Sequence, residues 1–293
     1  MTLLLMAAGS GSRYGKLKQF DDLGPAGEFL MEFSIHDAIE QGFNHIVVIT
    51  KAANQSFLQE HLSQRLPDNV KLDVLVQDIN DLPKGVTLDT QREKPWGTAH
   101  AVWTARDVIK NDFVIINADD YYGQKAFEGA AKFVKNATEN TYAIVGYSLK
   151  DTLSDHGSVS RGVCKANGEQ LTSIVEHTKI VRKDDIIVDE DSGAQLAPDT
   201  IVSMNFWICN TSIFDYIETY FKNFLEEPSN LEKSEIYLPF VAQEMMSNGL
   251  IDINVIDSKS NWFGVTYYAD KEEAVSTLAD LTNKGSYPTP LWN

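Results

Sequence analysis

The sequence predicts an α/β protein whose central sheet is mostly parallel, with helices packed on both of its faces. Short apolar runs rich in valine, isoleucine and leucine alternate with stretches of helical periodicity over the first 150 residues. Strands separated by helices are joined by crossover connections, which place the helices on the faces of a parallel sheet. The chain of 293 residues is 43% hydrophobic and 10% aromatic, so it is large and apolar enough to enclose a substantial core.

The N-terminal half supplies the alternating strands and helices of this prediction. Five apolar runs are predicted as strands, over residues 2–7, 45–50, 71–77, 113–117 and 141–149. Four stretches between them have helical spacing, over residues 29–42, 54–66, 98–109 and 126–137. Leu30, Phe33 and Ile39 mark the apolar face of the first helix, and Gly42 suits its end.

The alternation ends near residue 150, and the C-terminal half has a different pattern. Asn167 and Gly168 form a turn signal between two β-prone runs, which predicts a hairpin. Further strands are expected over residues 200–210 and 251–256, and helices over residues 211–225, 234–249 and 270–283. The sequence contains no internal repeat and no low-complexity linker, so we expect one domain with halves at about 1–150 and 151–293, the second of which shapes a second pocket.

The composition limits the partners of the protein. Its formal net charge is −17 and its isoelectric point is about 4.7, so it lacks the excess of cations with which proteins bind nucleic acid or anionic membranes. A small phosphorylated ligand is still compatible, because it requires only a local cluster of N–H groups, cations or metal. The two cysteines, Cys164 and Cys209, are expected to be free thiols. No apolar run reaches membrane-spanning length, so we expect a cytoplasmic protein.

A glycine-rich loop follows the first predicted strand, in the stretch MAAGSGSRYGKLKQF from Met6 to Phe20. A dinucleotide-binding loop requires glycine where Tyr14 stands, and a P-loop requires glycine where Ser10 stands, so neither pattern fits. The remaining interpretation is a strand followed by A-A-G-x-G-x-R and a lysine. At the carboxyl end of a strand, such glycines allow backbone N–H groups to approach a triphosphate closely.

This stretch resembles the signature loop of the nucleotidyltransferase superfamily that makes nucleotide sugars, which includes glucose-1-phosphate uridylyl- and thymidylyltransferases and N-acetylmuramate-1-phosphate uridylyltransferases. The family pattern is roughly A-A-G-x-G-x-R-x(n)-K. The resemblance implies a three-layer α/β/α sandwich related to the GT-A glycosyltransferases, with Arg13 and Lys18 as the catalytic cations. The nucleotide-binding residues that it implies in the loop are Ala7, Ala8, Gly9, Ser10, Gly11 and Ser12.

Two later segments resemble further parts of the family's nucleotide site. In QREKPWGTAHAV, Gln91, Gly97 and Thr98 match the segment that reads the base, where the glutamine amide can pair with a pyrimidine edge. For Thr98 an alternative is capping of the helix that follows the Pro-Trp turn. In FVIINADDYYG, Asp119 matches the aspartate that holds Mg²⁺, and Asp120 is its neighbour. A carboxylate at the tip of a buried strand suits a hard cation that is shared with phosphates.

The resemblance continues into a sugar-phosphate pocket. The matching residues there are Gly162, Glu176, Lys179 and Asn205. It implies that the glycine backs the sugar, the glutamate binds its hydroxyls, and the lysine meets its phosphate. The largest departure is Gly264, which stands in NWFGVTYYAD where sugar-specific members carry a second metal-binding aspartate. Either one carboxylate is enough, or Asp257 substitutes, or the protein is impaired.

These matches imply a nucleotidyltransferase that joins an NTP, with UTP favoured, to a sugar 1-phosphate and releases pyrophosphate. The sugar-phosphate oxygen would attack the α-phosphorus in line, and Mg²⁺ on Asp119 would bridge the phosphates. The short spacing between Arg13 and Lys18 resembles the cofactor-cytidylyltransferase branch instead. Transfer of a cytidylyl or other nucleotidyl group to a non-sugar acceptor is therefore one alternative, and a catalytically silent nucleotide-sugar-binding protein is another. The sequence leaves a homo-oligomer open.

The register of the loop predicts different roles for its two lysines. Lys18 is expected to stabilise charge at the phosphorus under attack, whereas Lys16 is expected to face solvent. Lys18→Ala should therefore lower kcat by a factor on the order of 100, because it removes an interaction that strengthens in the transition state. Lys16→Ala, the matched control, should leave kcat and KM nearly unchanged in a pyrophosphate-release assay. An essential Lys16 beside a dispensable Lys18 would contradict this register.

Overall fold

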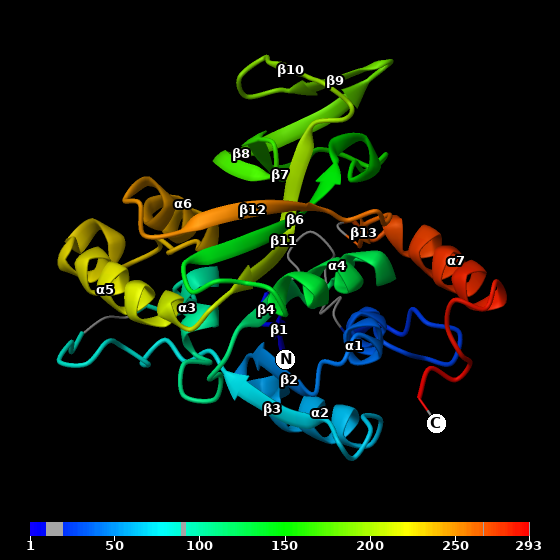
Figure 1. Cartoon of the computed structure of the whole chain (residues 1–293), viewed down its shortest axis with the longest axis horizontal. Helices are drawn as coiled ribbons and strands as arrows, with labels where there is room; N and C mark the ends of the chain where they lie inside the picture. The colour runs from blue at the N-terminus through cyan, green and yellow to red at the C-terminus, as the bar shows by residue number, and fades with distance from the viewer. Residues whose placement is uncertain (10–19, 89–91, 266, 293) are drawn as a thin grey trace.

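The computed structural model describes residues 1–9, 20–88, 92–265 and 267–292, and a large sheet forms its centre (Figure 1). The strands of this sheet are β1 (Thr2–Met6), β2 (His45–Thr50), β3 (Lys71–Val76), β4 (Phe113–Asn117), β6 (Thr141–Ser148), β7 (Val159–Asn167), β8 (Gln170–Lys183), β9 (Ile186–Asp189), β10 (Gln195–Leu196), β11 (Ile201–Cys209) and β12 (Asp252–Asp257). Their order is β10-β9-β8-β12-β6-β11-β4-β1-β2-β3, and β7 pairs with both β8 and β11. A separate ladder joins β5 (Asp120–Tyr121) to β13 (Phe263–Gly264).

The sheet is mixed, so the prediction of a mostly parallel sheet was wrong. Parallel pairing links β4, β1, β2 and β3 in the N-terminal half, and it also links β6 to β12. β11, however, runs antiparallel to both β4 and β6, and the strands from β7 to β10 continue in antiparallel pairs. The strands from β7 to β10 are joined by short turns without helical crossovers, and strands joined in that way run antiparallel.

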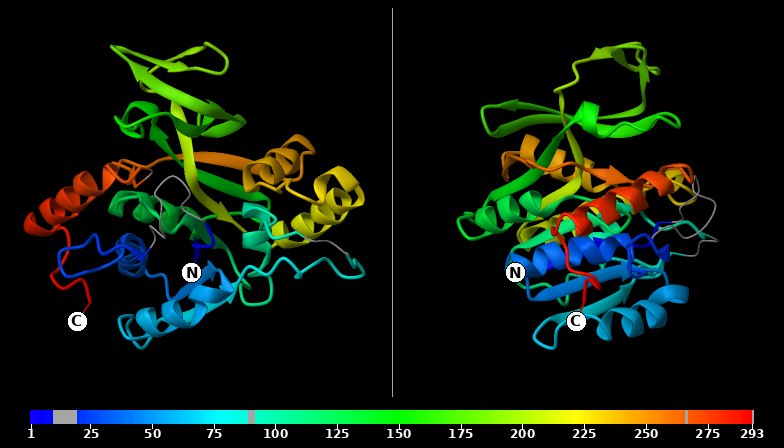
Figure 2. Two further views of the ribbon diagram at one scale, coloured as in Figure 1. Left: turned by 180° about the vertical axis from the view of Figure 1, so that it is seen from behind. Right: turned by 90° about the vertical axis from the view of Figure 1, so that its right-hand side faces the viewer.

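Helices cover both faces of the sheet, as the sequence predicts (Figures 1 and 2). They are α1 (Leu30–Glu40), α2 (Ala52–Ser63), α3 (Thr98–Trp103), α4 (Gln124–Val134), α5 (Ser212–Glu226), α6 (Leu238–Ser247) and α7 (Asp270–Asn283), with short 3₁₀ helices at Leu149–Asp151 and Pro228–Asn230. The predicted helix 234–249 begins only at Leu238, because Pro239 favours the first helical turn. Within the described part of the chain, no helix combines the length and apolarity that a membrane crossing needs.

The alternation of side chains along each strand produces two apolar cores. Leu3 and Leu5 of β1 face one core together with α1, α2 and α4. Leu4 faces the other core together with α3, α5 and α6. Both cysteines are free and buried, as expected. Burial raises the pKa of Cys164 to about 12, so this thiol stays protonated at neutral pH.

The predicted hairpin is present and is longer than expected. β7 and β8 pair antiparallel around a turn at Asn167 and Gly168, and Gly168 has a φ of 61°, a conformation that glycine adopts readily. The far part of β8 pairs with β9 and so extends the sheet, at the top of Figure 1. The hairpin therefore joins the central sheet to an extension formed by β8, β9 and β10.

The C-terminal segment after α7 is tied to the ladder of β5 and β13 by tyrosines. The hydroxyl of Tyr287 donates to Oδ2 of Asp37 at 2.8 Å and lies 2.7 Å from the hydroxyl of Tyr121. Tyr121 stacks on Phe263 with their ring centroids 4.5 Å apart. Burial raises the pKa of Asp37, so its carboxyl depends on the hydroxyl that reaches it.

We predict that Tyr287→Phe lowers the free energy of unfolding by about 1–3 kcal/mol, because it removes a hydrogen bond that the Tyr287 hydroxyl donates to a buried carboxyl. Tyr237→Phe is the matched control, since its hydroxyl donates to Glu235 at an exposed site. That control should change stability by less than about 0.5 kcal/mol. Urea denaturation of the three proteins gives both values. Equal small effects would mean that the Tyr287 hydroxyl contributes nothing to folding.

Candidate active site

The glycine loop and the aspartate pair leave the sheet next to each other. β1 and β4 are parallel neighbours with Met6 opposite Asn117, so both strands end at the same edge. The N–H of Ala118 donates to the carbonyl oxygen of Met6 at 3.1 Å, which continues this pairing beyond β4. Asp119 therefore follows β4 at the place where the loop leaves β1. Ligands of open α/β sheets bind at this edge.

The structure describes only the beginning of the predicted nucleotide loop. Ala7 and Ala8 are buried, and Ala7 packs in the core under the sheet edge. Gly9 is exposed, and no described atom lies within 4 Å of the position that its Cβ would take. This exposure of the Gly9 backbone is compatible with close approach of a phosphate. The other residues predicted for the nucleotide, Ser10, Gly11, Ser12, Arg13, Lys18 and Gln91, lie outside the described residues.

The two aspartates after β4 differ in burial. Asp119 is half-buried, whereas Asp120 is 7% exposed. The side-chain amide of Asn117 donates to Oδ2 of Asp120 at 2.9 Å. The hydroxyl of Tyr122 lies 3.3 Å from the same oxygen, but it lies only 2.8 Å from the carbonyl oxygen of Met204, to which it donates. The Asn117 amide is therefore one donor that orients the Asp120 carboxylate.

Most of the residues predicted for the sugar phosphate line a cavity of about 120 Å³, which we call the acceptor cavity. Its lining includes Gly162, Glu176 and Asn205, which come from β7, β8 and β11. Gly162 pairs with both Glu176 and Ser203, so it stands in the middle of this wall. Asp120 also lines the cavity, whereas the aligned Asp119 does not. The cavity thus joins the predicted acceptor residues to the edge where the loop and the aspartates leave the sheet.

Asn205 has a backbone conformation that is unusual for a residue other than glycine. Its φ is 60°, in the left-handed region, where asparagine is among the better tolerated residues. The register between β11 and β6 shifts between Ser203 and Trp207, so the irregularity interrupts the ladder at this point. Such interruptions re-aim side chains near functional sites. In this structure the interruption places Asn205 in the cavity wall.

The surroundings of Glu176 in the cavity wall shift its pKa in two opposite directions. Water reaches the side chain of Glu176, but the protein around its carboxyl desolvates it and raises its pKa above the ordinary 4.5. The positive charge of Arg161 acts in the opposite direction with a smaller effect. Arg161 is 7% exposed, donates from Nε to the hydroxyl of Thr152 at 3.1 Å, and lies with Cζ 4.8 Å from the ring centroid of Trp262. It is therefore a fixed cation at this cavity.

Lys179 does not line this cavity, which departs from the role expected for it. Its Nζ lies 2.7 Å from Oδ1 of Asp191, at an exposed position of β8. Nearer the cavity, β8 presents Glu176 instead. The cation that lines the acceptor cavity is Arg161, which precedes Gly162 on β7.

Gly97 and Thr98 form a packed junction between α3 and α6. Gly97 has a φ of 105°, and a Cβ there would lie 2.4 Å from the carbonyl oxygen of Ile236. The hydroxyl of Thr98 accepts a hydrogen bond from the N–H of Leu238 at 2.9 Å, so it caps α6 rather than its own helix. Pro239, the next residue, lines the acceptor cavity. The predicted base-reading segment is therefore connected directly to that cavity.

The oxygen donors at this edge fit a magnesium site that is completed by substrate. Among the described residues, no three His, Cys, Asp or Glu side chains are grouped so that they could hold a metal ion. Mg²⁺ is usually bound through one or two carboxylates, water and substrate phosphates. Asp119 and Asp120, consecutive residues after β4, provide carboxylates of that kind beside the start of the loop.

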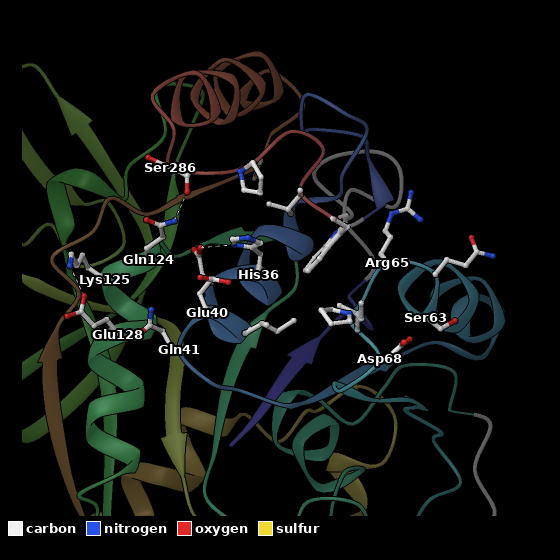
Figure 3. Close-up of a pocket in the computed structure, with 18 residues that line it drawn as sticks. His36, Glu40, Gln41, Ser63, Arg65, Asp68, Gln124, Lys125, Glu128 and Ser286 are labelled. Carbon is white, nitrogen blue, oxygen red and sulfur yellow. Dashed lines mark hydrogen bonds and ion pairs between the residues drawn. The ribbon is translucent and has the colours of Figure 1, made fainter.

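A larger cavity of about 1000 Å³ lies elsewhere, between α1, α4 and the C-terminal segment (Figure 3). None of the described residues predicted for substrate lines it. Lys125 pairs with Glu128 at 2.6 Å, and the amide of Gln124 donates to the carbonyl oxygen of Ser286 at 2.9 Å. Much of its polar lining is thus engaged with other protein groups, and we place the chemistry at the smaller cavity.

Comparison with known proteins identifies the family of the chain. A family model for nucleotidyl transferases matches residues 3–267. The chain belongs to the nucleotidyl transferase family. It is therefore an enzyme of that class, and the match spans both the loop and the wall of the acceptor cavity.

Individual relatives of this nucleotidyltransferase have different substrates in their names. It is 25% identical to UTP–glucose-1-phosphate uridylyltransferase 1 of Staphylococcus saprophyticus over 227 residues, which are 73% of this chain and 74% of the relative. The inositol-1-phosphate CTP transferase of T. maritima has a TM-score of 0.60 at 14% identity, over 94% of this chain and 95% of that one. A UTP-bound UGPase of Acinetobacter baumannii has a TM-score of 0.60 at 16% identity, over 94% and 92%. At these identities the two structures show the fold alone.

Sequence reasoning missed several residues of the nucleotidyltransferase cavity. Arg161 stands directly before Gly162 in SRGV, and Asn117 stands at the end of the apolar run before the aspartates. Their positions beside predicted residues were the available signal. Trp262 also lines the cavity, and its signal was its place in the segment NWFGVTYYAD, two residues before Gly264.

We predict that Gly97→Ala destabilises this nucleotidyltransferase more than Gly85→Ala does. Both glycines have positive φ, at 105° and 86°, so both substitutions introduce backbone strain, which costs about 1–3 kcal/mol. Only Gly97 also has backbone atoms of another segment within 3 Å of its Cβ position; near Gly85 no described atom lies within 4 Å. Urea denaturation measures the difference. Equal losses would show that the contact with Ile236 relaxes at no cost.

Proposed function

We propose that this nucleotidyltransferase transfers the nucleotidyl group of a pyrimidine NTP, with UTP preferred, to a sugar 1-phosphate and releases pyrophosphate. The observation that carries the proposal is the acceptor cavity, in which Asp120 meets Gly162, Glu176 and Asn205 from separate strands. Carboxylate and amide side chains on such a wall bind hydroxyl groups. Relatives named for UTP and glucose 1-phosphate support the choice of substrates.

In this reaction the protein contributes mainly by positioning the substrates and stabilising charge. Glu176 accepts hydrogen bonds from sugar hydroxyls, Asn205 accepts or donates one, and the absence of a side chain at Gly162 leaves room for the ring. Arg161 contributes positive charge near the acceptor phosphate. The attacking phosphate oxygen then lies on the side of the cavity that faces Asp120 and the glycine loop.

The nucleotide occupies the loop side of the same edge. Residues 7–12 and Arg13 hold the β- and γ-phosphates, Lys18 stabilises charge at the α-phosphorus, and Gln91 reads the base. Asp119 holds Mg²⁺, which neutralises phosphate charge when bound. The pairing of β11 with β4 joins the nucleotide half and the acceptor half in one sheet, so we propose that they act as one domain.

A second reaction is supported by two observations. The spacing from Arg13 to Lys18 is short, and the fold is as similar to an inositol-1-phosphate CTP transferase as to a UGPase. The alternative is cytidylyl transfer to a phosphorylated polyol that is not a sugar. Both reactions use the same cavity, because both acceptors offer a phosphate and a ring of hydroxyls.

A pyrophosphate-release assay over four NTPs, with Mg²⁺ and glucose 1-phosphate, N-acetylglucosamine 1-phosphate or inositol 1-phosphate, tests the proposal. UTP with a sugar 1-phosphate should react at least about 100-fold faster than ATP or GTP, because a hydrogen-bonding base site leaves its own groups unpaired with the wrong base. Fastest turnover of CTP with inositol 1-phosphate would instead establish the alternative. No release from any pair would contradict both. As a control, Glu176→Gln should raise the KM of the acceptor and leave that of the NTP unchanged.

A further inference from the structure

We propose that Asp120 supplies the second carboxylate of the metal site, in the place that a side chain at position 264 would occupy. Gly264 is then glycine because the Asp120 carboxylate fills the space beside it. This inference rests on the proposed use of Mg²⁺. It adds Asp120 to the aligned Asp119 as a second metal ligand. It also resolves the largest departure of the sequence from its family, since the missing carboxylate comes from the facing strand.

The ladder between β5 and β13 sets this geometry. Gly264 lies directly opposite Asp120 in antiparallel pairing. A Cβ at Gly264 would lie 2.5 Å from Oδ1 of Asp120, and 2.7 and 2.8 Å from two ring carbons of Trp262. Carbon atoms do not approach that closely without displacing their neighbours. Neither alanine nor aspartate fits at position 264 while Asp120 and Trp262 keep their places.

The position of Asp120 suits a metal ligand. Its carboxylate is anchored through Oδ2 by the amide of Asn117 at 2.9 Å, and it lines the acceptor cavity together with Glu176. Second partners of this kind orient a ligand before the metal binds. Asp119, the preceding residue, stands beside the start of the loop. These two residues, consecutive in the chain, would hold Mg²⁺ together with water and phosphate ligands.

Asp257, the other candidate for the missing carboxylate, is in the wrong place. It ends β12 opposite Gly146 and is exposed. Its Oδ1 accepts a hydrogen bond from the N–H of Lys259 at 3.1 Å. The cavity at Asp120 is not among those that it lines. It therefore serves as the matched control for a carboxylate that plays no part in metal binding.

Binding of Mn²⁺ to the protein without substrates, followed by the electron paramagnetic resonance signal of the free ion, tests the assignment. Asp120→Asn keeps an oxygen for the Asn117 amide but removes the charge. It should weaken Mn²⁺ binding by at least about tenfold, the smallest loss that disrupted metal sites usually show. Asp119→Asn should produce a similar loss, and Asp257→Asn should produce none. Unchanged binding in Asp120→Asn, beside a loss in Asp119→Asn, would overturn the proposal.

A second measurement uses the unaltered protein, so it does not depend on how a variant folds. Fe²⁺ with ascorbate and peroxide cleaves the backbone next to the ligands of a bound ion, and mass spectrometry locates the cuts. We expect cuts in both residues 119–121 and residues 262–265, suppressed by excess Mg²⁺. Cuts confined to the first segment would overturn the place given to Asp120 against β13. Because neither measurement includes an NTP, failure of the proposed transfer reaction would leave both results unaffected.

Discussion

The parallel pairing of β1 with β4 is the constraint on which the rest of the site depends. It fixes Met6 opposite Asn117, and the bond from the Ala118 N–H to the Met6 carbonyl carries the register past the strand ends. A slip of one residue would turn every side chain of a strand to the other face. The two apolar cores prevent such a slip, because Leu4 belongs to one core while Leu3 and Leu5 belong to the other. Core packing therefore determines that Gly9 and Asp119 leave the sheet at the same edge.

The antiparallel β11 brings Asn205 and the cavity wall to the same edge. It lies between β4 and β6, so the C-terminal half of the chain is built into the same sheet as β1, from which the glycine-rich segment leaves. The left-handed conformation of Asn205 interrupts its pairing with β6 where the cavity lies. Strain of this kind persists only where the surrounding structure enforces it. The pairing of β11 with β6 on both sides of the interruption, and with β4 and β7, provides that enforcement.

Aromatic packing supports the small ladder of β5 and β13. Tyr121 follows Asp120 and stacks on Phe263, which precedes Gly264, so one ring contact fixes both strands. The Tyr287 hydroxyl meets that of Tyr121 from the C-terminal segment. Residues nearly 170 positions apart thus hold the carboxylate of Asp120 against a glycine backbone. The C-terminal segment takes part in positioning the candidate metal site, although it does not line the cavity.

By itself the sequence determined most of the helices and strands, and the edge of the sheet at which the predicted nucleotide loop begins. The runs at 45–50 and 113–117 are strands with those bounds, because their apolar side chains are buried on both faces and have no helical periodicity. The glycine loop and Asp119 follow from local patterns, since a strand and the residues directly after it are contiguous in the chain. The roles of Arg13, Lys18 and Gln91 remain predictions.

Only the tertiary structure decided how the strands run and which side chains share the cavity. The antiparallel direction of β11, the exclusion of Lys179 and the inclusion of Arg161 all depend on pairings between distant segments. The fit of Gly264 against Asp120 depends on such a pairing as well, and no local pattern contains it. The physical reason is that one residue's position in a ladder is set by the register of its partner strand, which hydrogen bonds and core packing select together.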